Sequence, residues 1–235
     1  MPARRDALVL LDRGHITVKG RMPCSSNATF LVELAHEAAT TLAVYKPGRG
    51  ERPLWDFPRR LFRREVAAYR LSEALGWGLV PLTTEREDGP LGEGSLQLFV
   101  PADFEQHYFT LREDPAHRER LRQICLFDLV ANNADRKGGH CLLGADGLVH
   151  AVDNGLCFHA EPKLRTVIWE FGGEAIPGQW RRDLERVVSR EVPDDVAALL
   201  APAERAALLA RARQIVAAER FPADAGEQRY PWPLV

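Results

Sequence analysis

The pattern of apolar residues changes along this chain, from strand-like in the first part to helix-like in the second. Three early segments alternate or are rich in β-branched and aromatic residues, which is typical of strands: residues 15–19, 28–34 and 40–45. Beyond Pro101 the apolar side chains recur at helical spacing, first over 115–132 and again from Gln179 onward. The sequence therefore predicts an α+β protein, β-rich in its N-terminal part and mainly helical in its C-terminal part.

One helix is expected within the β-rich part, over residues 58–75. Phe62, Val66 and Tyr69 can share one face at helical spacing. Gly76 is the residue type that commonly ends a helix. The other expected elements are strands at 79–84, 95–100, 141–143 and 148–152, and a turn-rich loop at 132–139.

The composition is that of an ordinary globular protein, with enough residues (235) for one large domain or two lobes. The longest stretch without a charged residue is 11 residues, so we expect no stable membrane insertion, which takes about 20 apolar residues. The first residues lack the long apolar stretch of a secretory signal, which favours a cytoplasmic protein. With 31 basic and 33 acidic residues, the chain lacks the positive charge expected of a nucleic-acid-binding protein.

The four cysteines are widely spaced and contain no C-x-x-C pair, so we expect reduced thiols and not a disulfide framework. A zinc site is conceivable, but its spacing matches no common zinc finger, and it is much the weaker interpretation. Its ligands would be Cys141, Cys157, His140 and His159.

Three features of the β-rich part could bind phosphate. Ser25, Ser26 and Asn27 lie in a polar turn, which can offer backbone N–H groups and hydroxyls to phosphate oxygens. Lys46 ends an apolar strand, and Glu65 on the following helix could pair with it. Taken singly, each feature has an ordinary explanation: a turn, a lysine in solvent and a solvated helix glutamate.

Two aspartates follow in the second half. Asp135 lies in the loop after a helix, and Asp153 ends a short strand. Phosphoryl transfer uses such a pair, one carboxylate to position the acceptor hydroxyl and one to hold a metal ion on the phosphates. Singly, Asp135 could instead pair with Arg136, and Asp153 could belong to a turn with Asn154 and Gly155. The joint order of all five features is much more specific than any one of them.

The segments that carry a family resemblance are SSNATF (25–30), VYKP (44–47), REVAAY (64–69), QLFV (97–100), NADR (133–136) and VDNGLCF (152–158). Together they resemble the phosphatidylinositol 3-/4-kinase-like branch of the protein-kinase-like fold. The similarity is closest to type II phosphatidylinositol 4-kinases and their bacterial relatives of unassigned substrate. It implies a two-lobed fold with ATP between the lobes. We expect an N-terminal lobe at 1–98 and a C-terminal lobe at 99–235.

The resemblance also implies roles for single residues. Lys46 would contact the ATP phosphates while paired with Glu65. Asp135 would be the catalytic-loop aspartate, and Asp153 would bind the metal ion. The other nucleotide-binding residues that it implies are Ser25, Ser26 and Asn27 in the polar turn and, through backbone groups at adenine, Phe99 and Val100.

One position departs from the family pattern. The family usually has an asparagine metal ligand five residues after the catalytic aspartate, and here that residue is His140. Imidazole suits Mn²⁺ and later metals better than Mg²⁺, so the metal is expected to be Mg²⁺ or Mn²⁺, held by Asp153 and His140. His140 could instead contact a phosphate, pack as a structural residue or mark weakened catalysis.

The sequence thus predicts an ATP-dependent, kinase-like phosphotransferase with an unidentified hydroxyl acceptor. It contains neither a polybasic membrane motif nor a cysteine cluster suited to palmitoylation, so a protein or small-molecule acceptor is favoured over a lipid. Two alternatives on the same fold remain open. One is a pseudokinase that only binds nucleotide, and the other is an enzyme that transfers AMP instead of phosphate.

Overall fold

A computed structural model describes the chain over residues 3–23, 27–188, 191–223, 226 and 229–235. Ser25 and Ser26, two of the expected nucleotide-binding residues, and Cys24 lie outside this described part.

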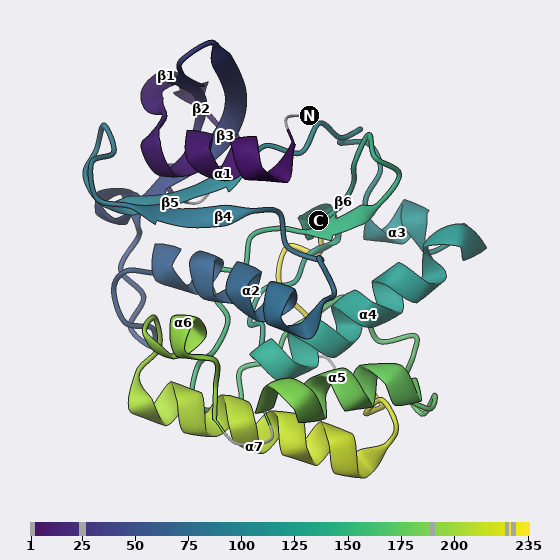
Figure 1. Ribbon diagram of the computed structural model, residues 1–235. Coiled ribbons are helices and arrows are strands. Elements are labelled where there is room, and N and C mark those ends of the chain that lie inside the picture. Colours follow the sequence, from purple (N-terminus) through teal and green to yellow (C-terminus); the bar gives the residue numbers. More distant parts are fainter. Residues whose placement is uncertain (1–2, 24–26, 189–190, 224–225, 227–228) are drawn as a thin grey trace.

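The N-terminal lobe is built on a five-stranded sheet with the strand order β1-β2-β3-β5-β4 (Figure 1). Every neighbouring pair of strands in it is antiparallel. Its three longest strands follow the expected β-rich segments, and Glu37 (φ 52°) turns the hairpin between two of them. The strands are β1 (His15–Arg21), β2 (Phe30–His36), β3 (Ala39–Pro47), β4 (Thr83–Arg86) and β5 (Gly94–Leu98).

The strand expected at 79–84 is wrong in its position, because β4 begins only at Thr83. Pro81 has no N–H group to donate to a neighbouring strand. The N–H groups of Leu79 and Val80 instead donate to the hydroxyl of Ser72 on α2, at 2.7 and 3.4 Å. The N–H groups of this segment are therefore fixed to the helix, and regular pairing with β5 is joined only from the carbonyl of Leu82, which accepts from the N–H of Leu98 at 2.8 Å.

Two helices pack against this sheet. The first, α1 (Arg4–Arg13), was not expected, although Ala7, Leu10 and Leu11 follow helical spacing and are buried. Leu10 and Leu11 join the same apolar cluster as residues of β2 and β3. The second helix, α2 (Phe62–Leu75), confirms the expected helix and ends at Gly76, whose φ of 75° suits glycine.

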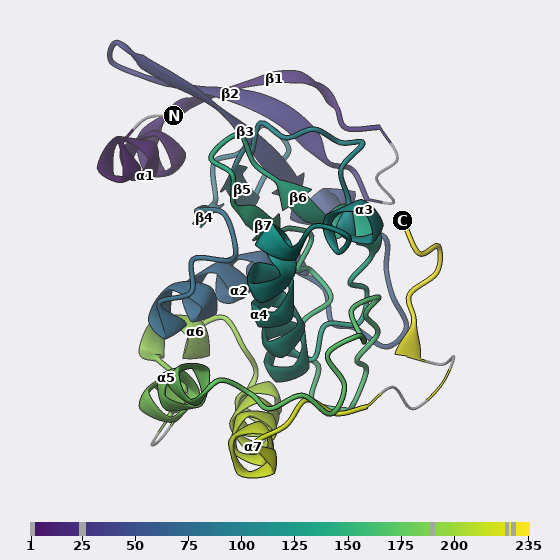
Figure 2. The ribbon, with the colours of Figure 1, turned by 90° about the vertical axis from the view of Figure 1, so that its right-hand side faces the viewer.

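The C-terminal lobe is mainly helical, and its long helices lie below the sheet in both ribbon views (Figures 1 and 2). Its long helix α4 agrees with the prediction to within one residue and is capped by Asp114, whose carboxylate accepts from the N–H of Ala116 at 2.9 Å. Its elements are α3 (Tyr108–Leu111), α4 (Pro115–Ala131), β6 (Cys141–Leu143), β7 (Val149–Ala151), α5 (Gly178–Val188), α6 (Asp194–Ala197) and α7 (Pro202–Ala218).

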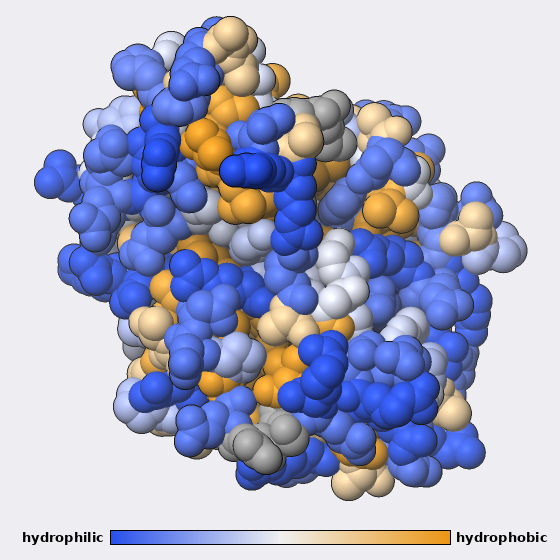
Figure 3. Space-filling model, in the orientation of Figure 1, coloured by the Kyte–Doolittle hydropathy of each residue, from blue (hydrophilic) through white to orange (hydrophobic). Residues whose placement is uncertain are grey.

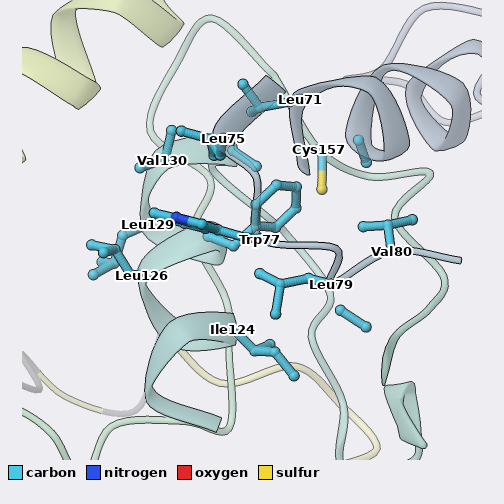
Figure 4. Close-up of a cluster of buried hydrophobic side chains, with 14 of the residues drawn as sticks. Leu71, Leu75, Trp77, Leu79, Val80, Ile124, Leu126, Leu129, Val130 and Cys157 are labelled. Carbon is cyan, nitrogen blue, oxygen red and sulfur yellow. The ribbon is translucent and has the colours of Figure 1, made fainter. Parts of the chain in front are cut away.

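One apolar core joins α2 to the C-terminal lobe. Leu71 and Leu75 of α2 belong to the same buried cluster as Ile124 and Val130 of α4 (Figure 4). This packing fixes the position of α2 relative to α4. It therefore also fixes the candidate site residue that α2 carries.

Among the described residues, no helix is both long and apolar enough to cross a bilayer. On the face shown in Figure 3, hydrophilic side chains predominate and the hydrophobic areas are small.

Candidate active site

Lys46, the penultimate residue of strand β3, is bonded to two carboxylates from different parts of the chain. Its ammonium group pairs with Glu65 of α2, which confirms the predicted ion pair. It also donates to Oδ1 of Asp153 at 2.8 Å. The attraction of Lys46 holds the pKa of Asp153 far below its usual range, and the two carboxylates raise the pKa of Lys46 despite its burial. Lys46 is therefore a fixed cation between the lobes.

Glu65 is less exposed than Lys46 and Asp153, and it makes a second contact between the lobes. Its side chain is 3% exposed, and burial raises its pKa while Lys46 opposes the shift. The oxygen that does not face Lys46 accepts from the backbone N–H of Asn154 at 2.9 Å. A Cβ at Gly155 would lie 3.3 Å from the Glu65 carboxylate, so glycine allows this close approach.

Asp153 follows β7 in an uncommon backbone conformation. Its φ is 55°, in the left-handed region that aspartate adopts more readily than most residues. Its side chain remains 53% exposed, although Lys46 occupies one of its oxygens. Such strained positions persist only where the surroundings fix them, and they cluster at functional sites.

A buried ion pair fixes the loop that contains Asp135. The side chains of Arg136 and Asp128 are both fully buried and bonded to each other, with Nε–Oδ2 and Nη2–Oδ1 distances of 3.0 and 2.9 Å. Asn133 extends the network, since its Nδ2 donates to Asp128 at 3.1 Å and its Oδ1 accepts from the N–H of Asp135 at 2.9 Å. The sequence analysis missed this pair, although the charge of Asp128 in an apolar helical stripe was a signal for it.

The same arginine reaches the segment around Asp153. Its Nη1 donates to the carbonyl oxygen of Val152 at 2.6 Å, and its Nη2 donates to Oδ1 of Asn154 at 2.7 Å. Arg136 therefore contacts both neighbours of Asp153 while adjoining Asp135 in sequence. One guanidinium positions the two candidate aspartates relative to each other.

Asp135 pairs with Lys137 and not with Arg136, which was the alternative considered from the sequence. The Oδ2–Nζ distance is 3.5 Å, and the Asp135 side chain is 29% exposed. Burial raises the pKa of Asp135 to about 6, with Lys137 opposing the shift. A carboxylate with a pKa near neutrality can accept a proton and later release it.

His140 lies beside Asp153, with Nε2 3.3 Å from Oδ2. Burial lowers its pKa to about 4, so the ring is neutral at physiological pH. Nδ1 lies 2.9 Å from the carbonyl oxygen of Asp135, which can only accept, and 3.3 Å from the N–H of Lys137. We assign the ring proton to Nδ1 on the closer contact. Nε2 then presents a lone pair to a carboxylate oxygen, an arrangement that a cation between them would satisfy.

Lys46, Glu65, Asp135 and Asp153 line one cleft of about 210 Å³. Asn27 of the polar turn lines it too, and its Oδ1 accepts from the N–H of Arg52 at 2.9 Å. The structure thus brings together the described part of the polar turn and the expected phosphate, metal and acceptor residues.

Phe99 and Val100 follow β5 and do not line this cleft. The N–H of Phe99 donates to the carbonyl oxygen of Leu42 at 3.0 Å, which continues the sheet pairing. Both residues border a separate cavity on the side of α1, so their assignment to adenine stays a prediction.

The zinc interpretation is wrong for the described residues. No group of three or more His, Cys, Asp and Glu side chains in that part of the chain is arranged to hold a metal ion. Cys141 and Cys157 are buried free thiols, and Nε2 of His159 instead contacts the carbonyl oxygen of Asp56 at 2.8 Å.

These elements and this site define the two-lobed protein-kinase-like fold, which solved structures confirm. A crystal structure of the Golgi casein kinase with Mn/ADP bound superposes with a TM-score of 0.60 at 17% identity, covering 98% of this chain and 80% of that chain. The structure of hydra Fam20 with sugar has a TM-score of 0.57 at 14% identity, covering 93% and 89%. These findings support the kinase-like fold and do not extend to the phosphatidylinositol 3-/4-kinase family.

The chain belongs to the same family as Protein Rv2133c of Mycobacterium tuberculosis (strain ATCC 25618 / H37Rv). The two are 40% identical over 270 aligned residues, which cover 99% of this chain and 97% of the relative. No known family model matches the chain.

The buried pair predicts a large loss of stability when only one partner is removed. Arg136→Met should lower the free energy of unfolding by about 3–5 kcal/mol, because the Asp128 carboxylate is left buried without its cation. Asp128→Leu combined with Arg136→Met should recover much of this loss. Urea denaturation measures both, with Lys19→Met in the exposed Lys19–Glu33 pair as the control, expected to cost about 1 kcal/mol or less. Equal losses in Arg136→Met and Lys19→Met would contradict the role of the pair.

Proposed function

We propose that this protein is an ATP-dependent phosphotransferase that moves the γ-phosphate to a hydroxyl acceptor. The observation that carries the proposal is Lys46, bonded at once to Glu65 and Asp153 in a cleft that Asp135 also lines. The fold neighbour with bound Mn/ADP supports nucleotide binding between the lobes. We place these lobes at 1–98 and 99–235, since β5 ends at Leu98.

Lys46 would neutralise charge on the ATP phosphates. It is held by Glu65 from one side and Asp153 from the other, so little entropy is lost when the phosphates arrive. Asn27, which lines the cleft, would lie over the phosphates. Phosphoryl transfer depends mainly on such positioning and charge neutralisation.

Asp135 would orient the acceptor hydroxyl and take its proton. Its carboxylate lines the cleft, and its pKa of about 6 makes it a better base than an ordinary aspartate while it stays ionised at pH 7. Lys137, 3.5 Å from it, would help to keep it ionised.

Oδ2 of Asp153 and Nε2 of His140 fit a divalent cation, since both are acceptors and lie 3.3 Å apart. Two protein ligands suffice where the nucleotide phosphates and water supply the rest, as is usual for Mg²⁺ and Mn²⁺ in kinases. When bound, the metal would neutralise the negative charge that develops on the phosphates. A neutral imidazole favours Mn²⁺ more than an amide would.

We propose that the resemblance to phosphatidylinositol 3-/4-kinases reflects shared ATP chemistry and not a shared acceptor substrate. The segments that carry it hold the phosphate, metal and transfer residues. The three described cysteines are free thiols, which supports our proposal that the protein works in the reducing cytoplasm.

The nucleotide product tests the proposed function. Incubation with ATP and metal should release ADP; pyrophosphate would indicate transfer of AMP, and no turnover would indicate a pseudokinase. Asp153→Asn should slow ADP formation at least about a hundredfold with an unchanged melting temperature, because an amide cannot neutralise the metal. Asp12→Asn on the exposed face of α1 is the control. Unchanged turnover in Asp153→Asn would refute the assignment.

The raised pKa of Asp135 predicts an acid limb in the rate profile. The ionised carboxylate is the active form, so kcat/KM should fall about tenfold per pH unit below about pH 6. Lys137→Met removes the cation that lowers this pKa, so the limb should move to higher pH. Steady-state ADP formation against pH measures both proteins. Superimposable limbs would exclude Asp135 as the titrating group.

His140 should set the metal preference. Wild type should turn over faster with Mn²⁺ than with Mg²⁺, and His140→Asn should shift the ratio toward Mg²⁺, because an amide oxygen is the harder ligand. ADP formation with each metal gives the ratio directly, and His15→Asn on β1 is the matched control. The same ratio in wild type and His140→Asn would remove His140 from the metal site.

A further inference from the structure

The loop between β3 and α2 borders a second cavity that joins the catalytic cleft. This cavity has a volume of about 720 Å³ and is lined by residues 48–49, 51–54, 57–61 and 92–93. It shares Glu51, Arg52, Leu54 and Leu61 with the cleft that Asp135 lines. A molecule in this cavity can therefore reach into the catalytic cleft.

Four arginines and two glutamates line the second cavity, but the glutamates are already engaged. Glu93 accepts two hydrogen bonds from Arg60, at 2.9 and 2.7 Å. Both oxygens of Glu51 accept from the backbone, one from the N–H of Arg60 and one from that of Phe62, each at 2.9 Å. The cavity thus carries an excess of positive charge that its own carboxylates do not neutralise.

Three arginines remain: Arg49, Arg52 and Arg59. All three are exposed, and none of their guanidinium groups has an ion pair or hydrogen bond to another described residue. A guanidinium presents several N–H donors in a fixed plane that matches phosphate and carboxylate oxygens. Three such groups around one cavity suit a ligand with more than one negative charge.

The loop that carries these arginines is fixed at several points. Asp56 binds Lys163 of the C-terminal lobe, with Oδ2 and Nζ 3.0 Å apart. Phe57 is buried with its ring against that of His159, at a centroid distance of 5.0 Å. A Cβ at Gly50 would lie 2.6 Å from that of Ala28, so the start of the loop is packed directly on the polar turn. The arginines therefore stand on a preorganised backbone.

We propose that this cavity is the acceptor site and that the acceptor is a compact polyanion bearing a hydroxyl group. The proposal rests on the proposed function. Arg49, Arg52 and Arg59 would bind its phosphate or carboxylate groups and direct the hydroxyl toward Asp135. The hydroxyl oxygen bonds to the γ-phosphorus as the bond to the β,γ-bridging oxygen breaks. Its proton passes to Asp135, and ADP leaves.

Cavity size favours a free small molecule over a longer ligand. A volume of about 720 Å³ lies within the range of about 300–1,000 Å³ that is typical of small-molecule sites. Trp55, which is 94% exposed on the same loop, lines neither cavity. The headgroup of an anionic lipid carries the same kind of negatively charged groups. The experiment below distinguishes a lipid from a free small molecule.

Equilibrium binding of pyrenetetrasulfonate, a compact fluorescent polyanion, tests the site. Fluorescence anisotropy is measured on the full chain with saturating ADP and Mn²⁺, so that the probe does not compete for the nucleotide site. Arg52→Gln combined with Arg59→Gln should weaken binding about tenfold or more, and Arg49→Gln alone should weaken it less. Arg5→Gln on α1 and Arg213→Gln on α7 make the same charge change elsewhere and should leave the affinity unchanged.

Equal affinity in wild type and the double variant, or an equal loss in the controls, would overturn the proposal. Cosedimentation with phosphatidylglycerol vesicles that depends on Arg52 and Arg59, without binding of the free probe, would overturn the choice of a free molecule. If the double variant does not fold, the affinity of the single Arg49→Gln variant for the probe decides the test. Calorimetric binding of ADP with Mn²⁺ to wild type is measured separately, and its failure would refute the proposed function while the probe result still stands.

Discussion

The buried ion pair between Arg136 and Asp128 is the interaction on which the candidate site depends. Neither charge could be buried alone, because desolvation would cost several kcal/mol. The pair requires α4, which carries Asp128, and its remaining donors bind the carbonyl oxygen of Val152 and the amide of Asn154. Asp135 adjoins Arg136, and Asp153 lies between the two acceptors. A single guanidinium therefore sets the spacing of both aspartates, and the planar fork of arginine makes lysine a poor substitute.

Glu65 has the corresponding role in the N-terminal lobe. One of its oxygens binds Lys46, and the other accepts from the N–H of Asn154. The Oδ1 of Asn154 thus accepts from Arg136, and its backbone N–H donates to Glu65, which fixes the left-handed turn at Asp153 from both lobes. Because α2 and α4 share one buried apolar core, the position of Glu65 is a consequence of core packing. A shift of α2 would separate Glu65 from Lys46 and from the N–H of Asn154.

Sequence reasoning found the elements with a strong period and the residues whose order is distinctive. Helix α4 was predicted from the spacing of its apolar residues, whereas the ion pair of Lys46 with Glu65 was predicted from the order of the motifs and the family resemblance that they carry. Asp128 was missed because an aspartate in an apolar helical stripe does not reveal which distant base neutralises it. Strand β4 was misplaced because the N–H groups before it bind a side-chain hydroxyl on α2 instead of a strand. Tertiary contacts decided both cases.

The charges within the cleft explain why cations matter to any nucleotide chemistry there. Around Asp153, the carboxylates of Glu65, Asp135 and Asp153 pair with only two lysines, Lys46 and Lys137, and the neighbouring His140 is neutral. Glu51 and Arg52, which also line the cleft, add one charge of each sign. Such a site repels a nucleotide triphosphate unless further positive charge enters with it. Nε2 of His140 and Oδ2 of Asp153 are both acceptors, and no proton lies between them. A cation bound there would supply the positive charge. Of the exposed arginines on the loop before α2, Arg52 lines this cleft as well, while Arg49 and Arg59 line only the second cavity. Most of the positive charge of that loop therefore lies beside the proposed nucleotide region, where it can hold an anion.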